Sequence, residues 1–108
     1  IDLAQSLRPL LTGEAGWSAR EEVFCEFDEQ AYPMPQRMVR TAAHKLVFNA
    51  ADICELYDLE RDPHELDNRI DDPAYREVKR DLLERLLAYQ RATGDPETRR
   101  LEAIHWAL

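Results

Sequence analysis

The sequence predicts an α+β domain in which a four-stranded antiparallel sheet packs against one long C-terminal helix, with a short N-terminal helix. Two observations lead to this class. Four short strand-like segments follow one another between residues 21 and 59, and an amphipathic stripe runs from Pro73 to Thr93. The connections between the four segments are too short for helical crossovers, so neighbouring strands must run antiparallel. A length of 108 residues leaves room for one domain.

The first strand is expected over residues 21–28, where apolar and acidic side chains alternate. Its apolar positions on one side are Val23, Cys25 and Phe27. Phe24 breaks the alternation, which indicates a strand covered partly on both faces. An irregular loop with two prolines follows over residues 29–36.

Three further strands complete the predicted sheet. Residues 37–41 and 45–49 read as a hairpin, joined by a tight turn that lacks the usual glycine. The last strand covers residues 54–59 and ends at an acidic loop containing Asp62-Pro63.

The long helix has clear start and stop signals. Asp72 is an N-cap, Pro73 stands in the first turn, and Gly94 followed by Asp95-Pro96 ends the helix. Its apolar stripe consists of Tyr75, Val78, Leu82, Leu83, Leu86, Leu87 and Tyr89. We interpret this stripe as core packing against the sheet.

The two ends of the chain are less regular. Leu3, Leu7, Leu10 and Leu11 predict a short helix that ends near Gly13. We place the domain over residues 1–96 and a helical tail over residues 97–108. Several apolar residues have no evident internal partner in this fold, and we expect them to form an apolar patch: Trp17, Tyr32, Met34, Leu101, Ile104, Trp106 and Leu108. Such a patch seldom stays open to water, so we expect either self-association into a homo-oligomer or a tail that folds back over it.

Composition excludes two classes of partner. The chain has 22 acidic and 14 basic residues, a net charge of −8, and no basic stripe, so nucleic acid is not expected. No apolar run approaches the roughly 20 residues that span a bilayer, so no membrane is expected. The compartment stays open, because the chain starts at Ile1 without a methionine.

Motifs of catalysis and metal binding are missing from the sequence. There is no glycine-rich phosphate loop, no GxSxG and no HExxH. Alternating acids from Asp58 to Asp62 suggest a calcium loop, but Pro63 and Arg69 stand where that loop needs glycine and glutamate. Cys25 and Cys54 lack zinc spacing. Both are expected to be buried thiols, and a disulfide between them stays open.

Four motifs resemble the C-terminal part of sulfatases, in the family's order. Residues 6–14 read SLRPLLTGE, residues 37–48 contain RMVRT and HKLVF, and residues 55–68 read ELYDLERDPHELDN. Asp71-Asp72-Pro73 and then Thr93 to Pro96 bracket the long helix. One departure is His44, where relatives usually carry an aromatic residue.

The resemblance implies a two-part parent enzyme, a sulfuric ester hydrolase. Its larger N-terminal α/β domain would hold a divalent metal, usually calcium, and a formylglycine made from Cys or Ser in C/S-x-P-x-R. In this chain Cys25 is followed by Phe27 and Glu29 at the proline and arginine positions, and Cys54 fits no better. The fragment is therefore expected to have no catalytic, cofactor or metal residues of its own.

The resemblance also marks residues of interest. The signature residues, expected to be structural, are Arg40, Thr41, Lys45, Glu55, Leu56, Tyr57, Asp58, Leu59, Asp62, Pro63, Glu65 and Asn68. Three others are expected at the rim of the parent's substrate cleft: Tyr32, Arg37 and His44.

The implied partner is the missing N-terminal catalytic domain. Two alternatives stay open: a stand-alone interaction or dimerisation module, and a subdomain of a related phosphate or phosphonate ester hydrolase. The sequence does not identify the sulfated substrate.

Overall fold

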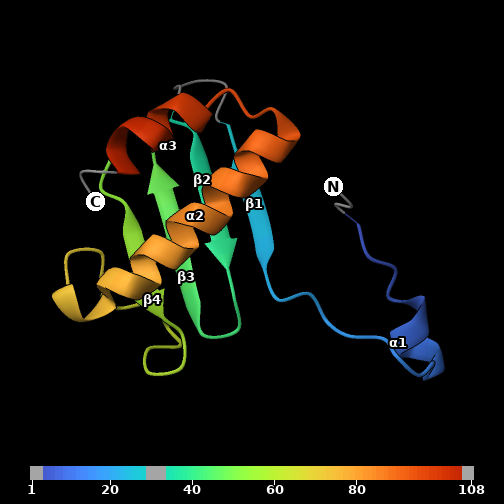
Figure 1. The fold of residues 1–108 in the computed structure, drawn as a ribbon. Coiled ribbons are helices and arrows are strands. Elements are labelled where there is room, and N and C mark those ends of the chain that lie inside the picture. The colour runs from blue at the N-terminus through green and yellow to red at the C-terminus, as the bar shows by residue number, and fades with distance from the viewer. Residues whose placement is uncertain (1–3, 29–33, 106–108) are drawn as a thin grey trace.

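The computed structural model describes residues 4–28 and 34–105, and it confirms the predicted α+β class. A single sheet is covered on one side by helices (Figure 1). In chain order the elements are α1 (Arg8–Thr12), β1 (Val23–Phe27), β2 (Gln36–Arg40), β3 (His44–Asn49), β4 (Glu55–Asp58), the 3-10 turn η1 (Pro73–Tyr75), α2 (Arg76–Thr93) and α3 (Thr98–His105).

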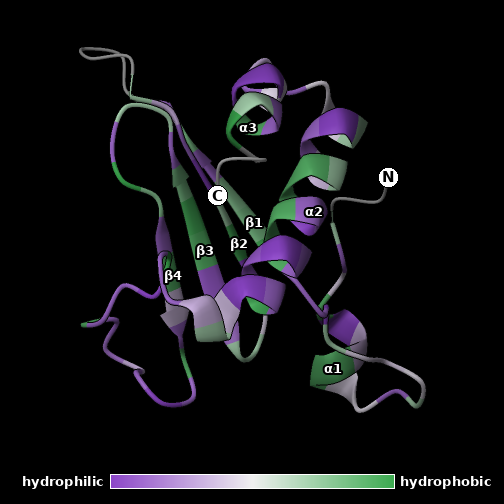
Figure 2. Ribbon diagram, turned by 60° about the vertical axis from the view of Figure 1, so that its left-hand side comes forward, coloured by the Kyte–Doolittle hydropathy of each residue, from purple (hydrophilic) through white to green (hydrophobic). Residues whose placement is uncertain are grey.

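The four strands form a meander in the order β1-β2-β3-β4, and every neighbouring pair is antiparallel. Both α2 and α3 lie on the same side of the sheet (Figure 2). We call the opposite side the open face. The strand register and the alternation of side chains assign these residues to it: Val23, Cys25, Phe27, Gln36, Met38, Arg40, Lys45, Val47, Asn49, Glu55 and Tyr57.

The core lies between α2 and the covered face of the sheet. The leucine stripe of α2 is fully buried there, as predicted. The buried apolar residues are Val39, Leu46, Phe48, Cys54, Leu56, Ile70, Leu82, Leu83, Leu86, Leu87 and Leu101. Phe24 reaches the same side and stacks on Tyr89, with ring centroids 4.2 Å apart. Phe24 therefore brings β1 into contact with the helix.

The orientation of β1 corrects two expectations. The alternating set Val23, Cys25 and Phe27 lies on the open face and is exposed, so β1 is covered from one side only. Cys25 is an exposed thiol, whereas Cys54 is buried, and both are free. Burial raises the pKa of the Cys54 thiol.

The turn between β2 and β3 needs no glycine because Thr41 supports it. The Thr41 hydroxyl accepts a hydrogen bond from the His44 N–H at 3.1 Å, and the Thr41 N–H donates to the His44 carbonyl at 2.9 Å. A side-chain oxygen thus replaces the backbone freedom that glycine supplies in most tight hairpins.

Both ends of the long helix match their sequence signals. Asp72 accepts a hydrogen bond from the Ala74 N–H at 3.0 Å, and Pro73 opens a single 3-10 turn before α2. At the other end Gly94 takes the left-handed conformation, with φ of 70°, and its N–H bonds back to the last turn.

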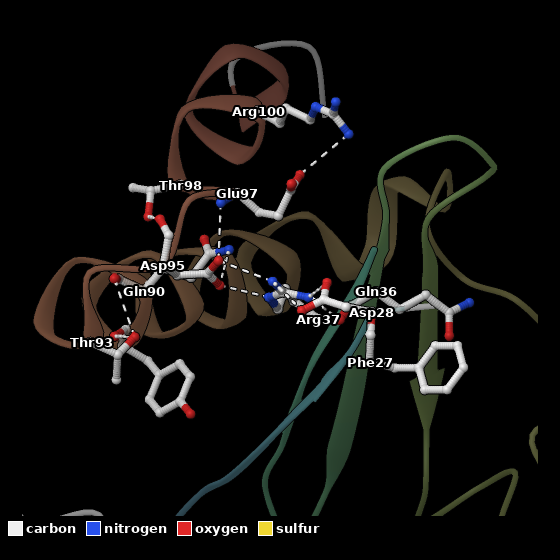
Figure 3. Close-up of polar contacts among 11 residues, drawn as sticks. Phe27, Asp28, Gln36, Arg37, Gln90, Thr93, Asp95, Glu97, Thr98 and Arg100 are labelled. Carbon is white, nitrogen blue, oxygen red and sulfur yellow. Dashed lines mark hydrogen bonds and ion pairs between the residues drawn. The ribbon is translucent and has the colours of Figure 1, made fainter. Parts of the chain in front are cut away.

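A buried ion pair fastens the link between α2 and α3 to the sheet (Figure 3). Arg37 of β2 is 2% exposed, and its guanidinium donates to Asp95 at 2.6 and 3.0 Å. The same group also donates to Asp28 at 2.9 Å and to the Gln36 carbonyl. Gln90 of α2, fully buried, donates to Asp95 at 3.2 Å.

The protonation of this pair follows from its contacts. Hydrogen bonding to Asp95 raises the pKa of Arg37. Burial alone would raise the pKa of Asp95, but hydrogen bonds from Arg37, the Glu97 N–H and Gln90 hold that pKa below its usual value. Both groups are therefore charged at neutral pH.

The tail folds back onto the domain, which is one of the two outcomes expected for the apolar patch, and it packs on the helix side of the sheet. Leu101 of α3 is fully buried and Ile104 packs against the core, so α3 contributes to the main core. By contrast, α1 buries none of its residues and lies beyond the β1 edge (Figure 1). Trp17 is half-buried and donates to the Ser6 carbonyl at 3.3 Å. Leu3, Tyr32, Trp106 and Leu108 lie outside the described residues.

Among the described helices, none is long and apolar enough to cross a bilayer.

The leucine stripe generates the first prediction. Leu82 and Leu86 are 1% and 0% exposed, so Leu82→Ala or Leu86→Ala should lower the free energy of unfolding by about 2–5 kcal/mol. Urea denaturation of the purified chain measures this. Glu84→Ala, on the exposed side of α2, is the matched control and should change stability by less than about 0.5 kcal/mol. Equal effects at positions 82 and 84 would contradict the packing.

The Arg37–Asp95 pair predicts acid sensitivity. Because the pKa of Asp95 is lower in the folded state, its stabilisation is present above about pH 4 and is lost as pH falls through the folded pKa. Asp95→Asn should therefore destabilise the chain at pH 7, by about 3 kcal/mol, and flatten the loss of stability in acid. Asp71→Asn, an exposed carboxylate, should do neither. An unchanged pH profile in Asp95→Asn, measured by urea midpoints from pH 7 to 3, would refute this assignment.

Candidate functional site

Most of the signature residues lie in β4 and the loop that follows it, and their polar side chains bond mainly to groups of this same region. Asn68 is the clearest case. Its side-chain oxygen accepts from the Leu56 N–H at 2.9 Å and from the Ile70 N–H at 3.0 Å, while its amide nitrogen donates to the Cys54 carbonyl at 3.1 Å. The Arg69 N–H adds a bond to the Leu56 carbonyl at 2.7 Å. The outer edge of β4 is thus covered by this loop.

Asp58 connects the end of β4 to the start of the long helix. It is buried, and it accepts a hydrogen bond from the Tyr75 hydroxyl at 2.8 Å. The Glu60 and Arg61 N–H groups donate to its other oxygen, each at 3.2 Å. The hydrogen bond from Tyr75, followed by those from the backbone, lowers the pKa of Asp58. The same bond raises the pKa of Tyr75. Both groups therefore act as a fixed structural link at neutral pH.

Asp62 and Pro63 shape the loop between these anchors. The Asp62 carboxylate accepts from the Leu66 and Asp67 N–H groups at 3.0 Å, which lowers its pKa. The Glu65 N–H donates to the Asp62 carbonyl, so Pro63 occupies the second position of a β-turn.

Glu65 carries the one positive φ at a non-glycine residue among the described residues, 55°. That backbone directs its carboxylate to Lys45 at 2.7 Å. The ion pair ties the acidic loop to β3.

A chain of polar side chains crosses the open face from β4 through β3 to the start of β2. Tyr57 donates to Glu55 at 2.6 Å, Asn49 donates to the other oxygen of Glu55 at 2.9 Å, and Gln36 donates to Asn49 at 2.7 Å. The bond to Glu55, together with burial, raises the pKa of Tyr57 to about 12. These residues therefore bond to one another across the open face, and Asn49, which is buried, also donates to the Ile53 carbonyl at 2.7 Å.

The structure does not bring the expected cleft-rim residues together. Tyr32 lies outside the described residues. Arg37 is buried in its ion pair, at the end of the hairpin opposite His44. His44 is half-buried and meets the ring of Tyr75 edge-on, with centroids 6.2 Å apart. The rim assignment stays a prediction.

Sequence reasoning did not find the partners of three anchoring residues: Asp95, Tyr75 and Asn49. Each was assigned to a cap, a stripe or a strand, and its partner lies elsewhere in the sequence. Each residue and its partner come close together only in the folded chain. A weak signal existed for Asp95, because a carboxylate directly after a helix C-cap needs a nearby cation.

Reactive groupings are not found in the described part of the chain. Within residues 4–28 and 34–105, no three His, Cys, Asp or Glu side chains are placed to hold a metal ion. The acidic loop forms a shallow pocket, but its carboxylates are engaged by backbone N–H groups, Tyr75 and Arg69.

Comparisons with known proteins agree with this geometry. The family described as N-sulphoglucosamine sulphohydrolase, C-terminal, matches residues 3–92. An uncharacterised protein of Haemophilus influenzae is 46% identical over 61 residues, which cover 56% of this chain and 31% of that protein.

Three solved structures share the fold. BT4656, solved with its substrate D-glucosamine-2-N,6-O-disulfate, is 26% identical with a TM-score of 0.70 over 86% of this chain and 20% of that one. BT1596, a 2-O GAG sulfatase, is 30% identical with a TM-score of 0.63, and the match covers 96% of this chain and 21% of that one. The phosphonate monoester hydrolase of Agrobacterium radiobacter is 28% identical with a TM-score of 0.65, and the match covers 95% of this chain and 21% of that one.

This chain thus spans about a third of the curated relative and about a fifth of the solved neighbours. The family match covers most of its length, including α1, all four strands and nearly all of α2. The chain therefore belongs to the N-sulphoglucosamine sulphohydrolase C-terminal family, the C-terminal part of sulfatases.

Proposed function

We propose that this chain is the non-catalytic C-terminal subdomain of a sulfatase whose parent polypeptide hydrolyses sulfate esters. One observation carries the proposal: the family match spans residues 3–92, yet the chain contains no C/S-x-P-x-R sequence. The nucleophile therefore has to come from another part of the parent. The low coverage of the solved neighbours, 20–21% of their length, supports a much larger parent.

In this proposal the subdomain is itself a rigid body that supports the catalytic domain. Most of the signature residues support this role, because their side chains bond within the subdomain. Asn68 fixes the edge of β4, Asp58 holds Tyr75, and Lys45 holds Glu65. Side chains that are engaged in this way position backbone and loops, and they carry no reaction step.

Formylglycine and calcium belong to the parent's catalytic domain in this proposal. The residues of this chain do not fit either group. Cys25 precedes Phe27 and Glu29, without the proline and arginine of the modification sequence. The acidic loop around Asp62 has its carboxylates turned onto backbone N–H groups.

The bond that the parent hydrolyses is inferred from its relatives. BT1596 is a 2-O GAG sulfatase, and BT4656 was solved with a sulfated glucosamine as substrate. These two relatives favour a sulfated sugar as the substrate of the parent. The phosphonate monoester hydrolase is an equally similar neighbour, so a phosphonate or phosphate ester is the second candidate.

Arg37 is least suited to the cleft rim of the three residues assigned there, because Asp95, Asp28 and two carbonyls take its donors. A stand-alone dimerisation module remains the alternative to a subdomain. The net charge of −8 disfavours it, since two copies repel each other.

The first test of this function is catalytic. The purified 108-residue chain should release no sulfate from aryl sulfates, with or without added calcium, because it lacks the nucleophile precursor. The parent polypeptide, assayed in parallel, should do so. Turnover by the short chain that survives repurification and disappears in Cys25→Ala or Cys54→Ala would refute the proposal.

The second test separates a structural signature from a catalytic one. Asn68→Ala removes three hydrogen bonds and leaves the Leu56 and Ile70 N–H groups without an acceptor, so stability should fall by about 1–3 kcal/mol. In the parent, kcat/KM well below the melting temperature should stay within about twofold of wild type. Asp67→Ala, at the exposed neighbour, should have little effect on either. A large loss of kcat/KM with unchanged stability would contradict the structural role.

A further inference from the structure

The two edges of the sheet differ in whether their backbone groups are paired. In an antiparallel sheet, alternate residues of a strand bond to one neighbouring strand, and the residues between them point the other way. On β4 the outward residue is Leu56. Its N–H donates to the Asn68 side chain, and its carbonyl accepts from the Arg69 N–H. The β4 edge is therefore closed to a further strand.

The opposite edge, formed by β1, is open (Figure 1). The bond from the Thr41 N–H to the His44 carbonyl fixes the alternation, so the backbone of odd-numbered residues in β2 faces β3 and that of even-numbered residues faces β1. The register between β1 and β2 then turns the backbone of Phe24 and Glu26 outward. In the described part of the chain, no group bonds to the outward N–H and carbonyl of these two residues.

A groove lies beside this open edge, between β1 and α2. It has a volume of about 220 Å³ and is lined by Glu22, Phe24, Arg85, Ala88 and Tyr89. The rings of Phe24 and Tyr89 stack, so the groove offers an aromatic surface. A strand added to β1 would place every second side chain on the helix side, and the side chain opposite Phe24 would enter the groove. Sheet edges with such a neighbouring pocket capture extended peptides.

The charges beside the groove favour a basic partner. Glu22 and Asp81 both contact Arg85, at 2.8 and 2.9 Å. Glu26 lies close to Tyr89, whose pKa is raised by burial and by the negative charge of Glu26. The groove and its edge therefore carry three carboxylates against one guanidinium. A segment with positive side chains complements that excess.

A second copy of this chain is disfavoured by the same charges. Its own β1 would bring Glu22, Glu26 and Asp28 to the edge, and like charges opposite each other across two strands are destabilising. The net charge of −8 on each copy adds to this repulsion. A different, basic strand therefore fits the edge better than β1 of another copy.

We propose that the β1 edge and the adjoining groove bind an extended peptide segment of another protein, which adds to the sheet as a further antiparallel strand. The segment carries an apolar or aromatic side chain opposite Phe24 and a basic side chain opposite Glu26. Its backbone bonds to the outward groups of β1 supply the affinity, and the two side chains supply the preference. This inference goes beyond the proposed function and does not depend on the reaction of the parent.

Backbone isomers of one peptide test the strand pairing. The probe is a labelled peptide, acetyl-Thr-Lys-Val-Tyr-Val-Lys-Thr-amide, titrated with the parent polypeptide and followed by fluorescence anisotropy. N-methylation of its Tyr and Lys amides removes the donors that face β1 and should weaken binding at least about tenfold. N-methylation of the two Val amides, which face solvent, should leave binding within about threefold. Equal binding of the two isomers, or no saturable binding of the unmethylated peptide, overturns the inference.

A charge reversal tests the preference for a basic segment. Glu26 is exposed, so Glu26→Lys leaves the core intact. In the parent this variant should bind the probe about fivefold more weakly, and it should prefer a peptide in which both Lys residues are replaced by Glu. Glu60→Lys makes the same change in net charge at an exposed position beyond the β4 edge and should alter neither affinity. Equal effects of the two variants would show that only net charge matters and would exclude this site.

Self-association is the competing occupant of the edge. Sedimentation equilibrium of the parent without peptide should show no dimer that depends on the β1 edge. Dimers that form with rising concentration and that the probe peptide dissociates would place a second copy on β1, and would overturn the inference.

Discussion

The burial of one leucine stripe against one side of a small sheet governs this structure. α2 presents Leu82, Leu83, Leu86 and Leu87 to the covered face, and Val39, Leu46, Phe48 and Leu56 meet them from three strands. A single helix can cover only one side of a sheet. The asymmetry of the molecule follows: one face is a closed core, and the other is left with half-exposed apolar and polar residues.

Polar anchors hold the helix at both of its ends. At the start, the Tyr75 hydroxyl bonds to Asp58 at the end of β4. At the finish, Asp95 pairs with Arg37 of β2, directly after the Gly94 cap. Both carboxylates are buried and have lowered pKa values, so the two anchors weaken together in acid. The leucine stripe provides most of the attraction, and the anchors set the position of the helix along the sheet.

Three residues of the family signature have polar side chains that are engaged within the chain itself. Asp58, Asp62 and Asn68 have their polar atoms engaged by backbone groups and by Tyr75. Such residues are needed for the path of the chain from β4 to α2. A subdomain built in this way has a fixed internal shape, with one face closed by helices and the other open.

The sequence alone determined the order and type of the elements, because local signals specify them. Asp72 and Gly94 mark the helix ends through caps that need only neighbouring residues. The missing C/S-x-P-x-R sequence also needed no structure to be recognised. The hairpin could be expected from strand spacing even though its turn relies on Thr41 in place of glycine.

Only the tertiary structure decided which side of each element is buried and which distant residues meet. The alternation in β1 defines two faces but not which of them faces α2, and Phe24 turned out to be the inward residue. Arg37 and Asp95 are 58 positions apart in the sequence, so no local pattern could pair them. Leu101 entered the core because the Gly94 turn folds α3 back onto the same side of the sheet as α2. Faces and long-range pairs depend on how the elements pack in space, and local sequence signals carry no information about that packing.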